Sequence, residues 1–306
     1  MFGNKVLKGV FLVGLGATSY GMLATFVKLA YSDLSSQGLH YTPAEVITAQ
    51  FVIGIIVIGM IAMFQKNRKG TLYVKATTTD IKKLLIVGTS TGLTSIFYYL
   101  AVKYIPVSIG IVLLMQTVWM GVLLEMFLEK KMPSKIKIFS VFMVLFGTAL
   151  ATNLFYNAID LDWRGIVLGL LAAASFTTTM YAANKVAITI SSAQRSLYML
   201  LGGAAVVLVF AFITQNTPFN YDIFYKWGII IALFGTIIPP MLLNAGFPLT
   251  GIGLGSIVSA LELPVSVTMA FVLLNETVVF SQWIGILLII LAIVIMNINF
   301  PKKLKT

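Results

Sequence analysis

The stretch SALELPVSVTMAFVLLNE, residues 259–276, has the composition of a membrane helix except for an acid and a proline near its middle. Glu262 and Pro264 stand there among Leu, Val, Met and Phe. A charged side chain at the centre of a membrane helix costs about 3 kcal/mol on insertion scales, and such residues are functional candidates by default. What Glu262 faces therefore decides whether the chain encloses a polar site inside a membrane.

The composition around this stretch is that of a membrane protein. The chain has 306 residues, of which 59% are hydrophobic and 10% charged, and its mean hydropathy is +0.98. Soluble proteins carry about 25% charged residues. The chain has no cysteine, which excludes disulfides, thiolate catalysis and cysteine metal sites. We see no short apolar region with a cleavage site before the first span, so we expect no removable signal peptide.

Apolar segments divide nearly the whole chain. A membrane-crossing helix needs about 20 mostly apolar residues, and segments of that kind predict ten spans. They are residues 9–31, 44–65, 82–103, 107–128, 136–155, 164–188, 195–214, 226–247, 252–274 and 280–299. Little chain remains between them, so we expect an all-α membrane protein without a soluble domain.

The basic residues predict the orientation, because cytoplasmic loops are enriched in Lys and Arg. With a cytoplasmic amino terminus, every Lys and Arg falls on the inner side except Lys28, Lys103, Arg164 and Lys226. The outer side also holds Asp33, Asp160, Asp162 and Asp222. We therefore expect both termini in the cytoplasm and a multi-pass protein of a bacterial-type cytoplasmic (inner) membrane. The net charge of +11 then reflects the anionic inner leaflet, and we expect no nucleic-acid partner.

Two stretches of the chain are alike. IPVSIGIVLLMQTVWMGVLLEMFLEKKMPS begins at Ile105 and IGLGSIVSALELPVSVTMAFVLLNETVVFS at Ile252; aligned without gaps, they put Glu129 on Glu276. Five spans followed by five would turn the second copy upside down, which predicts a first repeat over residues 1–158 and an inverted second repeat over 159–306. Inverted repeats are typical of secondary transporters. The alternative is a chance likeness of two leucine-rich helices.

Over nearly its whole length the chain resembles EamA-type members of the drug/metabolite transporter superfamily. The resemblance is carried by YYLAVKYIPVSIGIVLLMQTVWMGVLLEMFLEKKMPS and by LLNAGFPLTGIGLGSIVSALELPVSVTMAFVLLNETVVFSQWIGILLIILAIVIMN. The acidic–Pro element of the family is similar to Glu262-Leu263-Pro264. Its Gly-Glu pairs read Leu128-Glu129 and Asn275-Glu276 here, so both glycines are missing, and Thr117 stands where the second half has Pro264. The resemblance implies ten helices in two inverted repeats, a central cavity, and export or exchange of small metabolites.

The residues around Glu262 predict a polar stripe. Gly255, Ser259, Glu262, Ser266 and Met269 are spaced by four and three residues, so they share one face of a helix. A small, polar face of this kind suits the wall of a cavity. The alternative is a protonated Glu262 that hydrogen-bonds a neighbouring helix and holds the bundle together. Pro264 removes a backbone donor and perturbs the turn before it.

A second disruption is expected in the eighth span. Pro239 and Pro240 are adjacent near its middle, and Asn244 follows one turn later. Non-helical backbone at this depth is tolerated only against protein or a water-filled space. Freed carbonyls there could bind a substrate ammonium or hydroxyl, although a proline kink without any ligand is an equal alternative.

Two further stripes end in lysine. The first span has Gly14, Thr18, Gly21, Thr25 and Lys28, and the sixth has Ala174, Thr178, Tyr181 and Lys185, again three and four residues apart. They predict cavity lining by Thr18, Thr178 and Tyr181, and the alternative is close helix packing by small residues. Lys28 and Lys185, like Pro239, Pro240 and Pro264, are candidates for gating or charge, and the alternative for the lysines is snorkelling to headgroups.

Aromatic and amide side chains complete the candidate lining. Tyr98, Tyr99, Gln116 and Trp119 are expected near the cavity, although aromatic residues also form belts at membrane interfaces. Glu125 is expected to reach water one turn from its helix end, without a role in the site.

Several classes of protein lack their motifs in this sequence. His40 is the single histidine, so an HExxH zinc site and a Ser–His dyad within the membrane are excluded. The five aspartates fall in loops or at helix ends, and neither a GxxxxGK[ST] phosphate loop nor a TVGYG filter occurs. We therefore expect neither an enzyme nor a cofactor or metal.

The sequence favours a secondary carrier of small organic metabolites, such as amino acids or drug-like amines, working by alternating access around a midplane cavity. Its expected partners are a small-molecule substrate and the lipid bilayer. Glu262 would bind either a coupling proton, with burial raising the pKa of its carboxyl, or a cationic group of the substrate. The alternatives are a lipid scramblase or an assembly scaffold, and, more weakly, a channel.

Overall fold

The computed structural model describes residues 2–67, 74–101, 104–105, 107–154, 162–275 and 277–298. Within these ranges the chain is helical, with one isolated β-bridge between Leu34 and His40. The helices are α1 (Phe2–Ser32), α2 (Pro43–Asn67), α3 (Thr78–Ala101), α4 (Val107–Leu114), α5 (Thr117–Glu129), α6 (Lys135–Ala151), α7 (Trp163–Lys185), α8 (Ser192–Thr214), the π-helical η1 (Phe224–Gly228), α9 (Ile229–Ala232), the π-helical η2 (Leu233–Ile237), α10 (Ile238–Thr250), α11 (Ile252–Ser259), α12 (Glu262–Leu273) and α13 (Phe280–Ile298).

The helices identify a multi-pass membrane protein. Among the described residues, nine helical stretches are long and apolar enough to cross a membrane. The fifth predicted span corresponds to α6, which has 17 residues and packs along α13. The count of ten spans therefore stays a prediction. The predicted boundary between the repeats, at 158/159, lies outside the described residues, as do Lys103, Asp160 and Glu276.

Two of the predicted spans each contain a tight turn, through which backbone hydrogen bonds continue. The span predicted over 107–128 breaks between α4 and α5, and that predicted over 252–274 breaks between α11 and α12. In the alignment of the repeats these breaks fall within two residues of each other. Pro264 lies in the first turn of α12, where backbone N–H groups have no acceptor within the helix, so its missing N–H costs little there. Pro264 thus stands at a helix start and does not kink a continuous helix.

The eighth predicted span is irregular along most of its length. Residues from Phe224 to Thr250 run through η1, α9, η2 and α10. Pro239 and Pro240 lie in the first turn of α10, the same position that Pro264 has in α12. The Thr236 hydroxyl in η2 donates a hydrogen bond to the Gln50 carbonyl of α2 over 2.9 Å, which fastens the irregular segment to its neighbour.

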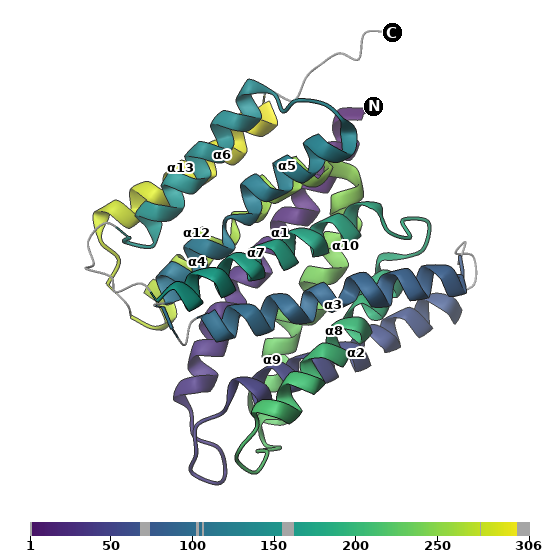
Figure 1. Cartoon of the computed structure of the whole chain (residues 1–306), viewed down its shortest axis with the longest axis vertical. Helices are drawn as coiled ribbons and strands as arrows, with labels where there is room; N and C mark the ends of the chain where they lie inside the picture. Colours follow the sequence, from purple (N-terminus) through teal and green to yellow (C-terminus); the bar gives the residue numbers. More distant parts are fainter. Residues whose placement is uncertain are drawn as a thin grey trace.

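The helices form two bundles, each of which draws on both repeats (Figure 1). In one, here called the α1 bundle, α1 packs against α10 and α12, and α2 packs against η1, α9 and η2. In the other, the α7 bundle, α7 packs against α3 and α4, and α8 packs against α3. In both, the first helix of one repeat packs against the third and fourth helices of the other. This exchange is what a two-fold relation between the repeats requires, and it means that the repeats are not two separate lobes.

The two ends of the molecule differ in charge. Figure 1 shows α1 beginning and α13 ending at one end, which we call the basic end because the α5–α6 turn there carries Lys130, Lys131 and Lys135. The α1–α2 and α8–η1 connections meet at the other end, which we call the acidic end because Asp33 and Asp222 lie there. At the basic end α5 and α11 pack against each other, whereas towards the acidic end α4 packs on α7 and α12 packs on α1. The halves α5 and α11 are therefore packed together at the basic end, whereas α4 and α12 belong to different bundles, which α2 and α8 join by packing against each other.

Candidate functional site

A small cavity lies between the two bundles. Its walls come from α1, α3, α7, α8 and α10, with the lining residues Tyr20, Thr91, Phe176, Thr179, Met180, Ala183, Met199, Leu200, Pro240, Leu243, Asn244 and Phe247. Its volume is about 20 Å³, which is room for about one water molecule. Of the residues predicted to line a cavity, the structure places Asn244 in this wall, and it places Pro240 there too.

Asn244 is the lining residue whose hydrogen-bonding capacity is left incomplete. Its side chain is 3% exposed, and its Nδ2 donates a hydrogen bond to Ser196 Oγ over 2.9 Å. No donor in the described part of the chain reaches its Oδ1. A buried acceptor without a partner costs free energy, typically about 1–3 kcal/mol. Oδ1 is thus an unused acceptor at the cavity.

A buried arginine next to Asn244 joins α8, on which it lies, to α7 and α10. Arg195 is 2% exposed, and its guanidinium donates hydrogen bonds to the carbonyls of Ala182, Ala183 and Val186 and to that of Asn244. The first three carbonyls lie at or just beyond the end of α7, where the helix dipole favours a positive charge. The sequence signal for this role is a lone arginine in the first turn of an otherwise apolar helix, but its position in the sequence predicts only that Arg195 lies on the inner side.

Glu262 lies between the two bundles. It begins α12, where the partial positive charge of the helix terminus favours a carboxylate. Its half-buried side chain interacts electrostatically with Tyr20 of α1 and Tyr98 of α3. The Tyr20 ring stands edge-on to Phe176 of α7, with centroids 6.0 Å apart. Tyr20, which sequence reasoning missed, therefore links the region of Glu262 to the cavity wall.

The small residues of α1 serve packing around Glu262. A Cβ placed on Gly21 would meet the Glu262 carbonyl oxygen and the Val265 side chain, so only glycine lets α1 approach the start of α12 this closely. Gly14 faces Leu261 and Val258. Thr18, half-buried between these glycines, lies on the same face of α1, next to the α11–α12 break.

The two serines near Glu262 differ. The hydroxyl of the buried Ser259 donates a hydrogen bond to the Gly255 carbonyl of its own helix over 2.9 Å. Ser266, one turn after Glu262, is half-buried. Of the pair, Ser266 is therefore the one with side-chain surface left for a bound molecule.

The stripe predicted on the sixth span lies away from the cavity. The cavity face of α7 is made by Phe176, Thr179, Met180 and Ala183. Thr178 is exposed on the opposite face, donates to the Ala174 carbonyl over 3.0 Å, and shares that face with the half-buried Tyr181 and the exposed Lys185. The expectation that Thr178 and Tyr181 line the cavity is thereby corrected: regular spacing identifies residues on one face but does not say what that face meets. Lys28 is exposed near the acidic end of α1.

Gln116 and Trp119 stabilise the break between α4 and α5. Gln116 Nε2 donates to the Val112 carbonyl over 3.0 Å, and Trp119 Nε1 donates to Gln116 Oε1 over 2.8 Å. Both side chains are half-buried, and their polar atoms are mostly occupied with each other.

Tyr98 and Tyr99 lie nearer the acidic end. Tyr99 stands edge-on to Tyr98 and to Tyr31 of α1, with ring centroids 6.2 Å apart in both pairs. The Tyr31–Tyr99 pair thus brings α1 and α3 of the two bundles into contact on this side.

At the basic end Glu125, which forms an ion pair within the first repeat, also contacts the second repeat. Glu125 of α5 accepts a hydrogen bond from Lys137 of α6, and its Oε1 accepts one from the Gly253 N–H of α11 over 3.1 Å. The expectation that Glu125 simply reaches water is corrected, because it is largely buried in this contact. Its partners depend on where α11 begins, which the sequence does not reveal.

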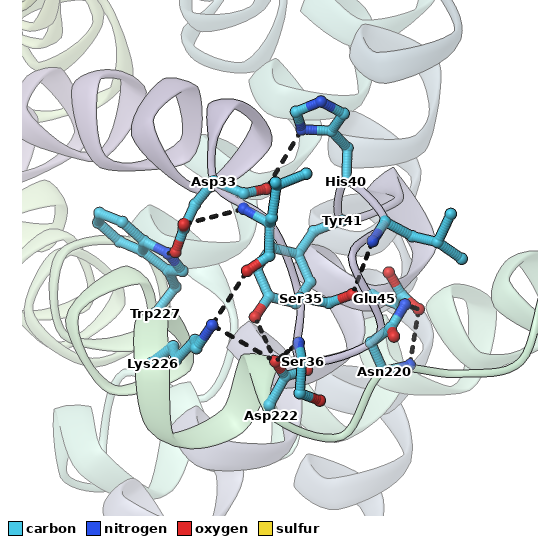
Figure 2. Close-up of polar contacts among 12 residues, drawn as sticks. Asp33, Ser35, Ser36, His40, Tyr41, Glu45, Asn220, Asp222, Lys226 and Trp227 are labelled. Carbon is cyan, nitrogen blue, oxygen red and sulfur yellow. Dashed lines mark hydrogen bonds and ion pairs between the residues drawn. The ribbon is translucent and has the colours of Figure 1, made fainter.

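At the acidic end a polar network fastens the α1–α2 connection to the start of η1 (Figure 2). Asp222, whose side chain is buried, accepts hydrogen bonds from the Ser36 N–H over 2.6 Å and from the Tyr41 hydroxyl over 2.9 Å, and its Oδ2 lies 3.6 Å from Lys226 Nζ. Burial raises the pKa of Asp222, but these hydrogen bonds and the charge of Lys226 outweigh it, so the pKa lies below its usual value. A hydrogen bond from Trp227 likewise lowers the pKa of Asp33.

Glu45 and Gln194 make equivalent contacts at opposite ends of the molecule. Glu45, fully buried at the start of α2, accepts hydrogen bonds from the Asn220 N–H and side chain and from Gln215, all just before η1. Gln194, at the start of α8, binds the Val74 carbonyl over 2.9 Å and the Ala76 N–H over 3.3 Å, just before α3. In each repeat the second helix thus holds the segment that leads into the third helix of the other.

Comparison with known proteins agrees with this architecture. The sequence profile of the EamA-like transporter family matches the chain twice, over residues 7–153 and 163–298. The chain belongs to the EamA-like transporter family. A search of curated proteins finds no match. Twenty-nine chains of solved structures match. One, titled "Crystal structure of protein", has 12% identity and a TM-score of 0.77 over 95% of this chain and 97% of that one, a likeness of fold.

Proposed function

We propose that the protein is a secondary active transporter, an exporter or exchanger, that moves small organic metabolites such as amino acids or drug-like amines across a bacterial-type cytoplasmic membrane. Ten spans in two inverted repeats, with both termini in the cytoplasm, complete the proposal. The basic end then faces the cytoplasm, as the enrichment of Lys and Arg favours. The protein is not an enzyme and needs no cofactor in this proposal.

One observation carries the proposal: each repeat has a membrane helix interrupted at an equivalent place. Discontinuous helices in corresponding positions of two repeats are the best pointer to a transporter's substrate site, because their ends free backbone groups at mid-depth. The α4–α5 and α11–α12 breaks are milder forms of this feature: the N–H groups of Gln116 and Leu261 donate to carbonyls three residues back, so the α-helical pattern is interrupted for one turn at corresponding positions. Irregular backbone at this depth is tolerated against protein or a water-filled space.

The packing of the broken helices supports alternating access. The halves α5 and α11 pack together at the basic end, while α4 and α12 belong to different bundles. The structure then corresponds to a state closed towards the cytoplasm. In the opposite state α4 and α12 would approach each other and α5 and α11 would separate, which inverted repeats permit with little change inside each bundle.

The position of Glu262 favours a carrier over a lipid scramblase. A scramblase needs its polar groove to face lipid, whereas Glu262 is half-buried in the neighbourhood of Tyr20 and Tyr98, which belong to opposite bundles. In this proposal Glu262 binds either a coupling proton or a cationic group of the substrate.

Counterflow in proteoliposomes tests the function. Vesicles containing the purified protein are loaded with a mixture of amino acids and aromatic amines, and uptake of each labelled compound is measured. We expect at least one compound to enter saturably and faster when the same compound is present inside. Transfer of fluorescent phospholipids between leaflets without any such counterflow would show a scramblase instead.

A further inference from the structure

We propose that Asn244 is a hydrogen-bond acceptor subsite at the floor of the cavity, which receives one N–H or O–H group of the transported molecule. The inference rests on the proposed function and names a chemical requirement of its substrate. It starts from Asn244 Oδ1, a buried oxygen at the cavity that no donor in the described structure reaches.

The rest of the Asn244 residue is held firmly. Ser196 Oγ accepts a hydrogen bond from the side-chain Nδ2 over 2.9 Å, and Arg195 donates one to the backbone carbonyl. Because Arg195 also binds the carbonyls at the end of α7, the amide is fixed relative to three helices at once. An acceptor fixed by its surroundings binds a donor without having to be ordered first.

The hydroxyl groups of the two threonines that line the cavity already take part in hydrogen bonds. Thr91 donates to the Gly88 carbonyl over 2.6 Å, and Thr179 contacts Ser90 Oγ over 2.7 Å and the Ser175 carbonyl over 3.3 Å. Tyr20 is the polar lining residue that interacts with Glu262. The remaining wall is apolar, with the side chains of Phe176, Met180, Ala183, Met199, Leu200, Pro240, Leu243 and Phe247. Among the polar groups of this wall, Asn244 Oδ1 is thus the buried acceptor that lacks a donor, and most of its surroundings are apolar.

This arrangement selects by chemistry and by size. An apolar surrounding strengthens a hydrogen bond and makes an unpaired polar group costly. Groups with a donor, such as an alcohol, a primary amide or an amine, can pair with Oδ1, whereas an ether or a carboxylate presents only lone pairs to it. Because the whole cavity has room for about one water molecule, it holds the terminal group of a bound molecule and not a ring. The predicted substrate is thus a largely apolar molecule whose end carries an N–H or O–H group.

Matched probes test this requirement in the purified full-length protein. Benzyl alcohol and benzyl methyl ether differ in the donor, and their dissociation constants can be measured by titration calorimetry in detergent. We expect wild type to bind the alcohol roughly fivefold more tightly, which corresponds to one net hydrogen bond of about 1 kcal/mol. Equal affinities, or no measurable binding of the alcohol, would overturn the proposal.

Variants locate the preference at Asn244. Asn244→Leu, of similar volume, should remove the difference between the two probes, whereas Asn244→Asp, which keeps an acceptor, should retain it and strengthen the binding of benzylamine. If Asn244→Leu does not fold, Ser196→Ala decides, because it frees the amide and should reduce the preference. Thr178→Val, on the opposite face of α7, should leave both affinities unchanged. A preference that survives in Asn244→Leu, or in Ser196→Ala at full size, would contradict the assignment.

Binding and transport can fail separately. A protein that prefers the alcohol through Asn244 but shows no counterflow would refute the transporter proposal and leave the subsite intact. Counterflow without any donor preference would refute the subsite alone.

Discussion

The two breaks in the membrane helices occupy equivalent places but carry different chemistry. At the first, between α4 and α5, Met115 is 2% exposed within the hydrophobic core, and Gln116 is bonded to Val112 and Trp119. In the alignment of the repeats, Met115 falls on Glu262, which is half-buried and lies in the neighbourhood of Tyr20 and Tyr98. The repeats share the backbone feature, but the ionisable group is present at one break. A symmetric fold thus supports an asymmetric site.

A second difference lies further along the same helices. Glu125 of α5 binds Lys137 and the start of α11. The residue aligned with Glu125 is Val272 of α12, which is 59% exposed. The inner halves of the broken helices are therefore joined by a charged contact that the aligned position of the outer halves cannot make. This difference favours closure at the basic end over closure at the acidic end.

The largest expected effect comes from removing the ionisable group. Glu262→Gln should reduce proton-driven accumulation in proteoliposomes by at least roughly tenfold, because the amide cannot carry a proton between the two sides. If Glu262 binds a coupling proton, counterflow of the substrate should persist. If it instead binds a cationic substrate group, counterflow should fall as well.

The aligned residue of the first repeat supplies the control. Met115→Leu conserves volume and should leave accumulation and counterflow close to wild type. Equal losses in Glu262→Gln and Met115→Leu would mean that the two breaks are sensitive only to packing. Full activity of Glu262→Gln in both assays would remove Glu262 from the mechanism.

Sequence reasoning found the repeating feature more readily than the contacts that distinguish its two copies. The lengths of apolar segments and the Ile105/Ile252 alignment predicted the helical class and the repeats, and the cost of a buried charge singled out Glu262. The α7 stripe shows the limit: Thr178 and Tyr181 do share a face, but the face opposite to them lines the cavity. Contacts such as Arg195 with the end of α7 depend on how separate helices meet, which spacing along one helix does not encode.

The next largest effect is on stability at the second break. Gly21→Ala places a Cβ against the Glu262 carbonyl oxygen and 2.8 Å from Val265 Cβ, so α1 and α12 must move apart. Overpacking of this kind costs about 1–3 kcal/mol, and thermal unfolding in detergent should show a lowered Tm. Gly14→Ala is the matched control, since its nearest neighbour, Leu261 Cδ1, would be 3.4 Å away. A Tm equally lowered in both variants would show that α1 does not pack more tightly on α12 than on the residues before it.

A smaller effect is expected from weakening the closed end. Glu125→Gln replaces the charged acceptor of the Gly253 N–H by a neutral one, which accepts more weakly, so α5 and α11 should separate more often. The chain has no cysteine, so a single Ser256→Cys between these helices reports on their separation by its rate of maleimide labelling. We expect the rate to rise roughly fivefold, as for the loss of about 1 kcal/mol of closing free energy. Glu129→Gln, on an exposed residue at the end of α5, is the control, and an unchanged rate in Glu125→Gln would show that the charge of Glu125 does not hold this end shut.

The smallest effect is expected from replacing Pro264, although it is the proline at the second break. The aligned residue of the first repeat is Thr117, and α5 begins there without any proline, so a proline is not needed to interrupt the helix. Pro264→Ala should therefore keep the break, change the free energy of unfolding by less than about 1 kcal/mol, and leave counterflow within about twofold of wild type. Thr268→Pro, one turn further into α12, should instead cost about 3 kcal/mol or more, because it clashes with the Pro264 carbonyl inside the helix. If Pro264→Ala folds but loses counterflow, the proline itself shapes the site, and the two breaks differ in backbone as well as in chemistry.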